Sequence, residues 1–228
     1  MPRKPILWAL GLTVCLAAVP LVVHDTFYLR VLTEAIMWIG LAISWDVLAG
    51  YTGYLNFGHG AFFGLGAYTT ALLMVKAGWP FPAGVAAGGV LAAVAALLAG
   101  IPTLRLKGAY FAIATWALAR AVQQIALILN VTGGPDGMRL PPFLHPEFFY
   151  YAMLAVTGAV FVILWILLES APFGLKLKAI RENEEGAMAL GLNPARIKIQ
   201  AFILSACPAG ILGGIYAYWI TYIDPAST

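Results

Sequence analysis

Charged residues are scarce in this sequence. They make up 10% of the 228 residues, whereas a soluble domain usually carries about 25%. So few charged side chains cannot cover a water-facing surface, which excludes an ordinary soluble globular protein. Hydrophobic residues are 62% of the chain, and the mean hydropathy is +0.88. This composition predicts a protein that crosses a membrane several times.

Other features are missing as well. The two cysteines, Cys15 and Cys207, lie far apart in apolar stretches, so no disulfide framework is indicated. The phosphate-loop pattern G-x-x-x-x-G-K-[ST] is absent, so this chain does not bind a nucleotide in that way. Histidine and acidic residues do not cluster, and we therefore expect no catalytic residues, no metal site and no nucleic-acid partner.

What the sequence does contain is a series of long apolar runs, close to the ~20 residues that a helix needs to cross a bilayer. We predict an all-α fold, a polytopic transmembrane helical bundle that forms a single domain over residues 1–228. It has about seven spans, near 6–23, 31–49, 61–77, 82–101, 109–129, 149–168 and 201–221. The first run is longer than the core of a secretory signal, so we interpret it as an uncleaved span.

The positive charges predict the orientation of the chain. With the N-terminus in the cytoplasm, three Lys or Arg residues fall outside (Arg30, Lys76 and Arg139), and Arg120 falls within a span. Nine fall inside: Arg3, Lys4, Arg105, Lys107, Lys176, Lys178, Arg181, Arg196 and Lys198. This excess on one side predicts a multi-pass protein with a cytoplasmic N-terminus.

The stretch "GYTGYLNFGHGAFFGLGAY", residues 50–68, is rich in glycine. Glycine costs about 1 kcal/mol against alanine inside a helix, so we predict a broken or re-entrant helix near residues 50–60. By the charge argument, residues 31–75 enter the membrane and come back. Two full crossings, or one crossing and a re-entrant return, both satisfy that requirement.

The break is a candidate substrate pathway. Transporters use the N-termini of broken helices to hold anionic substrate groups, and the helix that restarts near Gly58 directs its N–H groups toward the break. We hypothesise that the pathway is lined by Asn56, Gly58, His59, Gly60 and Asp46. The alternative is that these glycines only allow helices to pack closely.

Few ionisable residues fall within the predicted spans. We expect Glu34 to lie near the outer interface and Asp46 to cap a helix or line a cavity. These two residues are twelve positions apart, about 120° around a helix. They do not share a face, which argues against a catalytic pair of carboxylates.

Residues 169–200 form the main hydrophilic segment. They include "AIRENEEGAMAL", which predicts a short amphipathic helix that Gly191 and then Asn193-Pro194 bring to an end. From its charges alone this segment is either a solvated linker or a docking element for a soluble partner.

Four motifs occur in order: "GYTGYLNFGHGAFFGLGAYT", "LRLKGAYFAIAT", "TGGPDGM" and "AIRENEEGAMALGLNPARIKIQAF". Together they resemble the permease subunits of bacterial ABC importers for branched-chain amino acids, of the LivM type rather than the LivH type. The resemblance covers about residues 31–221. It implies a permease subunit, not an enzyme, that translocates branched-chain or similar hydrophobic amino acids across the bacterial inner membrane.

The resemblance also implies partners. These are a homologous permease of the LivH type, two ATPase subunits and a periplasmic or extracellular substrate-binding protein. The ATPase subunits hydrolyse ATP, and this chain binds no cofactor. Such permeases carry an E-A-A-x-x-x-G loop that docks on the ATPase. In the cytoplasmic coupling loop 169–200, the matching residues are Glu185, Gly186, Ala187 and Gly191, with Gly186 in place of the first alanine.

Some points depart from the family or stay open. Members often have an acidic residue where this chain has Arg120, and they continue with further membrane segments beyond the position of Thr228. We therefore expect the chain to be incomplete at its C-terminus relative to the family. Related permeases transport urea, amides or other amino acids. A stand-alone secondary transporter is a further alternative.

Overall fold

The computed structural model describes residues 11, 13, 15–21 and 25–224 of the chain. The long helices are α2 (Thr26–Thr52), α3 (His59–Ala77), α4 (Phe81–Thr103), α5 (Ala109–Ile128), α6 (Pro146–Trp165) and α9 (Pro194–Ile220). The shorter elements are η1 (Asn130–Thr132), η2 (Gly134–Asp136), β1 (Met138–Arg139), the π-helical turn η3 (Ile166–Ser170), α7 (Pro172–Glu182), α8 (Glu184–Ala189) and β2 (Tyr222–Ile223).

The predicted all-α membrane bundle is confirmed. Among the described residues, six helices are long and apolar enough to cross a membrane, namely α2, α3, α4, α5, α6 extended by η3, and α9. They coincide with the last six predicted spans. The first predicted span, 6–23, falls largely outside the described residues, and its described part is helical.

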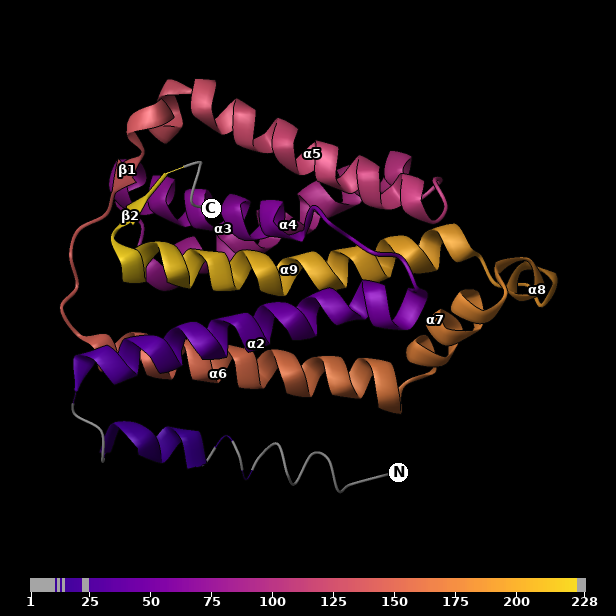
Figure 1. Cartoon of the computed structure of the whole chain (residues 1–228), viewed down its shortest axis with the longest axis horizontal. Coiled ribbons are helices and arrows are strands. Elements are labelled where there is room, and N and C mark those ends of the chain that lie inside the picture. Colours follow the sequence, from indigo (N-terminus) through magenta and orange to yellow (C-terminus); the bar gives the residue numbers. More distant parts are fainter. Residues whose placement is uncertain (1–10, 12, 14, 22–24, 225–228) are drawn as a thin grey trace.

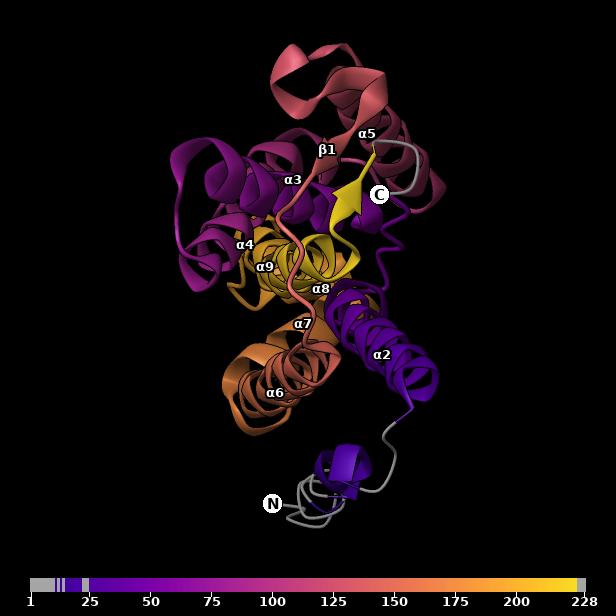
Figure 2. The same cartoon turned by 90° about the vertical axis from the view of Figure 1, so that its left-hand side faces the viewer.

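The long helices lie side by side with α9 at the centre (Figure 1). Viewed from one end, α3 and α4 lie on one side of α9, while α2 and α6 lie on the other (Figure 2). Helices α7 and α8 cover one end of the bundle, which we call the α8 end. At the other end, β1 pairs with β2 and ties the loop before α6 to the residues after α9.

Glycines allow α3 and α9 to approach closely. A Cβ on Gly66 would lie 1.9 Å from the carbonyl oxygen of Gly210, and one on Gly213 would lie 2.0 Å from that of Phe63. Contacts of this kind bring backbones together in membrane helices, where van der Waals packing drives association. The close-packing explanation therefore holds for Gly66, at the far end of the glycine-rich stretch.

The predicted break in the glycine-rich stretch is also present. Helix α2 ends at Thr52, and Gly53 follows in the left-handed conformation (φ 76°), donating its N–H to the Ala49 carbonyl at 3.1 Å. A glycine takes this conformation at low cost, which explains its place at the helix end. Residues 53–58 are not helical, and α3 starts at His59. We call residues 53–58 the extended segment.

The hydrophilic segment differs from its prediction. One helix was expected over "AIRENEEGAMAL", residues 179–190, but the structure divides it between α7 and α8. The division falls at Asn183, whose backbone is extended (φ −156°) and whose side-chain oxygen accepts a hydrogen bond from the Gly186 N–H at 2.8 Å. Asn183 thus caps a new helix, a role for which asparagine is well suited.

Candidate functional site

The extended segment runs back along α2 before α3 begins. The Trp45 indole N–H donates to the Asn56 carbonyl at 2.8 Å, and Ser44 Oγ lies 2.9 Å from His59 Nε2. Ser44 is eight residues before the end of α2, about 12 Å along a helix. Helix α3 therefore starts inside the bundle and not at its α8 end (Figure 1). The return path after α2 begins as extended chain and continues as helix.

The irregular backbone of the extended segment is held by neighbouring side chains. The Asn56 side-chain oxygen accepts from the Gly58 N–H at 2.9 Å, and Thr115 Oγ1 of α5 accepts from the Phe57 N–H at 3.2 Å. Such backbone is tolerated at membrane depth only where protein or water satisfies it. A Cβ on Gly58 would lie 2.3 Å from the Thr115 carbonyl oxygen, so this position requires glycine.

Two buried polar atoms at the break have no hydrogen-bond partner among the described residues. They are the side-chain nitrogen of Asn56 and Nδ1 of His59, whose residues are 1% and 8% exposed. The Ser44 hydroxyl donates to the Leu41 carbonyl at 2.8 Å, so it accepts from His59 Nε2–H. In this assignment Nδ1 is a free acceptor. Buried groups without partners are costly, and these two offer one donor and one acceptor to a ligand.

Hollows flank the start of α3. One is a groove of about 480 Å³ between α3 and α5, and another is a groove of about 400 Å³ between α2 and α3. Gly60 lines both grooves, and His59 lines the α2–α3 groove. Asn56 and Gly58 line a third hollow of about 360 Å³ that reaches α4. The structure thus brings together four of the five predicted pathway residues.

Asp46, the fifth predicted pathway residue, does not line the hollows beside the break. It is exposed and lines a separate hollow at the α8 end with Tyr51, Glu169 and Lys178. Asp46 follows Ser44 by two positions, which is about 200° around a helix. Because Ser44 faces His59, the carboxylate of Asp46 points away from the break.

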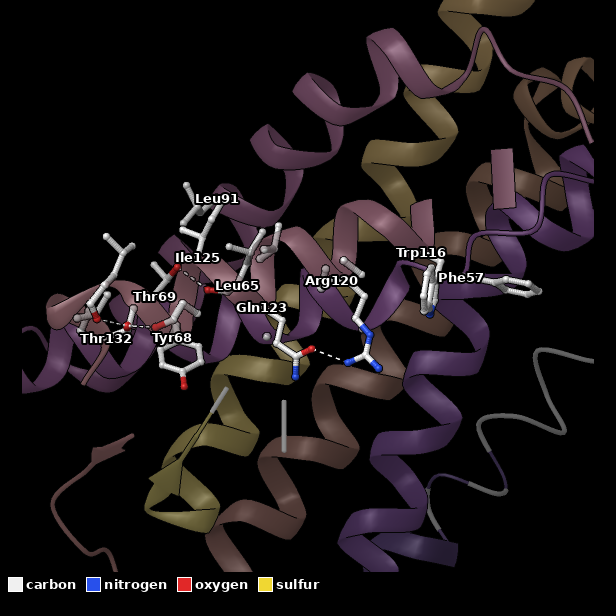
Figure 3. Close-up of a pocket in the computed structure, with 18 residues that line it drawn as sticks. Phe57, Leu65, Tyr68, Thr69, Leu91, Trp116, Arg120, Gln123, Ile125 and Thr132 are labelled. Atoms are coloured by element: carbon white, nitrogen blue, oxygen red, sulfur yellow. Dashed lines mark hydrogen bonds between the residues drawn. The ribbon is translucent and has the colours of Figure 1, made fainter. Parts of the chain in front are cut away.

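Arg120 lies in the α3–α5 groove (Figure 3). The sequence analysis did not place this residue in the pathway. Its guanidinium donates to the Gln123 side-chain oxygen at 2.7 Å and lies 5.8 Å from the centre of the Trp116 ring. No described acidic residue pairs with it. The signal that could have found it is a cation within an apolar span, which usually faces a cavity.

The four predicted coupling residues lie together on α8 and the turn that follows. Ala187 is buried, whereas Glu185 and Gly191 are exposed. Gly191 is left-handed (φ 84°), and no heavy atom of the described residues lies within 4 Å of where its Cβ would be. Beside them Met188 is 49% and Leu190 83% exposed. These two apolar side chains were missed from sequence. We call residues 184–191 the coupling segment.

These features define a class. The six apolar helices, and the break beside grooves with mostly apolar walls, are the features expected of a membrane permease. The chain belongs to the family described as branched-chain amino acid transport system / permease component, which matches residues 27–228. The predicted resemblance is confirmed, and this family consists of permease components and not of enzymes.

Named relatives agree with this assignment. The chain is 34% identical over 260 residues to the high-affinity branched-chain amino acid transport system permease protein LivM of Escherichia coli (strain K12). That match covers 98% of this chain and 60% of the relative. It is 29% identical over 152 residues to a probable LivM of Methanocaldococcus jannaschii, covering 61% of this chain and 44% of the relative.

More distant similarity extends to other permeases. A ribose import permease protein of Bacillus subtilis, RbsC, is 38% identical over 55 residues, which is 24% of this chain and 17% of the relative. No solved structure matches the chain. The chain spans 60% and 53% of the length of the LivM proteins of Escherichia coli and Salmonella typhimurium.

Proposed function

We propose that the chain forms a transmembrane permease domain of an ABC importer that passes branched-chain or similar hydrophobic amino acids across the bacterial inner membrane. The observation that carries this proposal is the break at Asn56–Gly60, where Asn56 and His59, each with one polar atom unpartnered among the described residues, line hollows with largely apolar walls. Family membership and the LivM names of the relatives support the substrate class.

The chemistry of the break suits a hydrophobic amino acid. The carboxylate of such a zwitterion needs a cation or donor, which Arg120 and the Asn56 side-chain nitrogen offer. Its ammonium needs an acceptor, and Nδ1 of His59 is free. Its aliphatic side chain fits apolar walls. We therefore place the pathway along Asn56, Gly58, His59 and Gly60, and Asp46 is left out because its hollow lies at the α8 end and not beside the break.

The backbone N–H groups near Gly58 were predicted to face the substrate. The N–H of Gly58 is already bonded to the Asn56 side chain, so it is not available to a substrate. We assign the recognition of substrate to side chains instead, with Gly60 as the open position between the α3–α5 and α2–α3 grooves.

We further propose that the coupling segment docks on one of two ATPase subunits, which hydrolyse ATP. A homologous permease of the LivH type and an external substrate-binding protein complete the transporter. The α8 end then faces the cytoplasm. The positive residues support this orientation, since those at the α8 end outnumber those at the other end. The N-terminal residues themselves lie outside the described part of the chain.

The proposed pathway is tested by thiol labelling at Gly60. With Cys15 and Cys207 replaced by serine, Gly60→Cys introduces a side chain into open space. We expect it to react with a water-soluble thiol reagent in the assembled transporter, and we expect leucine to slow the reaction. The reason is that a cysteine at Gly60 lies in both grooves.

Gly58 and Gly66 show why the choice of position matters. A cysteine at either glycine has no room, because backbone atoms lie 2.3 Å and 1.9 Å from the Cβ. An inert Gly60→Cys in a folded transporter contradicts the pathway and favours a purely structural role for the break. If the cysteine at Gly60 reacts with the thiol reagent at the same rate with and without leucine, Gly60 faces water but lies away from the substrate.

A further inference from the structure

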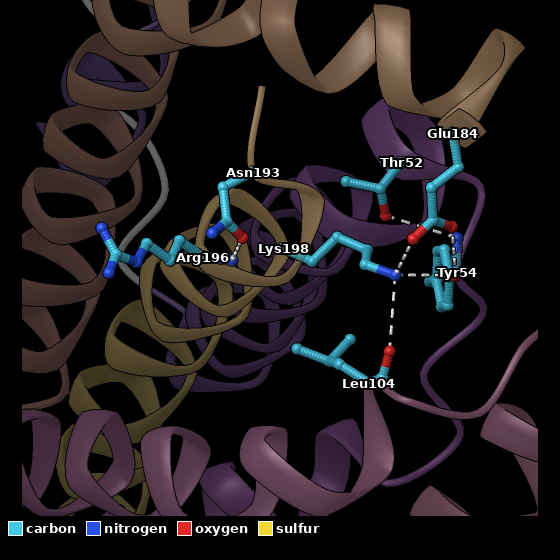
Figure 4. Close-up of polar contacts among 7 residues, drawn as sticks. All are labelled: Thr52, Tyr54, Leu104, Glu184, Asn193, Arg196 and Lys198. Atoms are coloured by element: carbon cyan, nitrogen blue, oxygen red, sulfur yellow. Dashed lines mark hydrogen bonds and ion pairs between the residues drawn. The ribbon is translucent and has the colours of Figure 1, made fainter. Parts of the chain in front are cut away.

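Lys198 is a buried lysine near the start of α9, at the α8 end of the bundle. Its side chain is 3% exposed. The ammonium lies 2.8 Å from Glu184 Oε1 and donates to the Tyr54 hydroxyl at 2.9 Å and to the Leu104 carbonyl at 3.4 Å (Figure 4). A buried charge is tolerated only where it is paired and hydrogen-bonded, and Lys198 meets both conditions.

The contacts of Lys198 join four separate elements. Tyr54 belongs to the extended segment, Leu104 follows α4, Glu184 begins α8, and Lys198 belongs to α9. The Tyr54 hydroxyl also donates to Glu184 Oε2 at 3.0 Å, and the Lys198 ammonium lies 4.5 Å from the centre of the Tyr54 ring. Tyr54 therefore contacts both members of the ion pair.

Glu184 is held in its charged form. Partial burial opposes ionisation of Glu184, but the hydrogen bonds and charge of Lys198 outweigh it, so the pKa of this carboxyl lies below its ordinary value. Glu184 therefore stays charged at neutral pH. Removing one member of a buried ion pair leaves an uncompensated charge, which is strongly unfavourable. Movement of Glu184 must therefore carry Lys198 and Tyr54 with it or break this arrangement at a high cost.

Glu184 and Tyr54, two side-chain partners of Lys198, belong to the two segments for which we propose a function. Glu184 starts the coupling segment, in the same turn as Glu185. Tyr54 is two residues before Asn56, whose side-chain oxygen accepts from the Gly58 N–H and whose carbonyl accepts from Trp45. Within the described residues, Tyr54 thus links the wall of the proposed pathway to the coupling segment by one direct hydrogen bond to Glu184, and Lys198 bonds to both Tyr54 and Glu184.

We propose that Lys198 is a positioning residue that transmits movement of the coupling segment, through Glu184 and Tyr54, to the extended segment at the start of α3. This proposal rests on the proposed transport function. Docking of the ATPase shifts α8, the ion pair moves with it, and Tyr54 then repositions Asn56 and the beginning of α3. The grooves beside Gly60 change shape as a result.

The chain contains a matched control. Lys178 pairs with Glu169 at 2.9 Å, the Tyr51 hydroxyl donates to Glu169 at 2.5 Å, and the Lys178 ammonium lies 5.2 Å from the Tyr51 ring. The chemistry is the same, but this pair is exposed, with side chains 49% and 32% accessible. In the described part of the chain, its ion pair, hydrogen bonds and ring contact join α2, η3 and α7.

The test compares Lys198→Met with Lys178→Met in proteoliposomes that contain the assembled transporter. Leucine uptake and ATP hydrolysis are both measured, and their ratio is the readout. For Lys198→Met we expect the ATP consumed per leucine to rise about tenfold, the scale of a lost coupling between sites. For Lys178→Met we expect a change within about twofold, as for an exposed pair. A merely structural role for Lys198 lowers the amount of assembled transporter but not this ratio.

If Lys198→Met does not assemble, Tyr54→Phe provides the measurement. It removes only the hydroxyl and keeps the ring against Phe111, 5.3 Å away between centres. We expect its ATP consumed per leucine to rise about fivefold. An unchanged ratio in the assembled variant overturns the proposal, and so does an equal rise in Lys178→Met. ATP-independent uptake by the wild type would instead contradict the proposed function.

Discussion

Replacement of Gly191 by leucine is expected to abolish transport while the protein still inserts and folds. Gly191 ends the coupling segment, is exposed, and has open space where a Cβ would lie. The Cβ of a leucine there lies within 4 Å of no described atom, and the side chain projects from the surface that we propose docks on the ATPase. We expect leucine uptake and substrate-stimulated ATP hydrolysis to fall about 30-fold or more, as at an interface hot spot.

The matched control is Gly191→Ala. Gly191 has φ 84°, and any L-residue in this conformation costs about 1–2 kcal/mol. Alanine and leucine share this backbone strain, but only leucine adds bulk. We therefore expect Gly191→Ala to keep most of its uptake. Equal losses in both variants would assign the effect to the backbone, and normal uptake by Gly191→Leu would refute the docking assignment.

A tryptophan at Gly60 is the second change with a large expected effect. Gly60 lines both the α3–α5 and the α2–α3 groove, and no described atom lies within 4 Å of its Cβ position. An indole is among the largest side chains, so it occupies the space proposed for substrate. We expect uptake of leucine to fall to background in Gly60→Trp, measured with radiolabelled leucine and normalised to the amount of assembled transporter.

Two variants separate blockage from misfolding. Gly60→Ala adds a methyl group and leaves the grooves open, so we expect near-normal uptake. Ile163→Trp places the same indole side chain at an exposed position of α6 that lines neither groove, and we expect uptake to be retained. Full uptake by Gly60→Trp is incompatible with a substrate path between these grooves.

The membrane spans and the helix break could be predicted from the sequence because each depends on local composition. Apolar runs of sufficient length have few other structures available to them, and the last six predicted spans agree with helices. The break followed from Gly50, Gly53, Gly58 and Gly60, which weaken a helix. The depth at which α3 restarts was not predictable, because it depends on contacts of Trp45 and Ser44 with residues beyond the break.

The candidate site could be predicted only in part. Asn56, His59 and Gly60 are close in sequence and stay close in the structure. Asp46 was predicted to join them, but it lies on a different face of α2 from Ser44, the residue that contacts His59. Lys198 pairs with Glu184 across 14 residues and with Tyr54 across 144. No periodicity in the sequence indicates such a distant contact.

The coupling segment shows a similar limit. Its position was predicted from motif spacing, but one continuous helix was expected where Asn183 starts a second one. A side-chain cap in mid-segment competes with helix continuation, and the outcome depends on packing. Here Ala187 and Leu177 are buried in the same core cluster, so both short helices pack against the bundle.

The most direct test of the central claim is leucine uptake by the assembled transporter in proteoliposomes, with and without ATP on the side of the α8 end. The account predicts uptake that requires ATP, that isoleucine and valine inhibit, and that urea and leucinamide leave unchanged. Uptake that an ion gradient drives without ATP, or that urea or leucinamide inhibits as strongly as isoleucine, would contradict it.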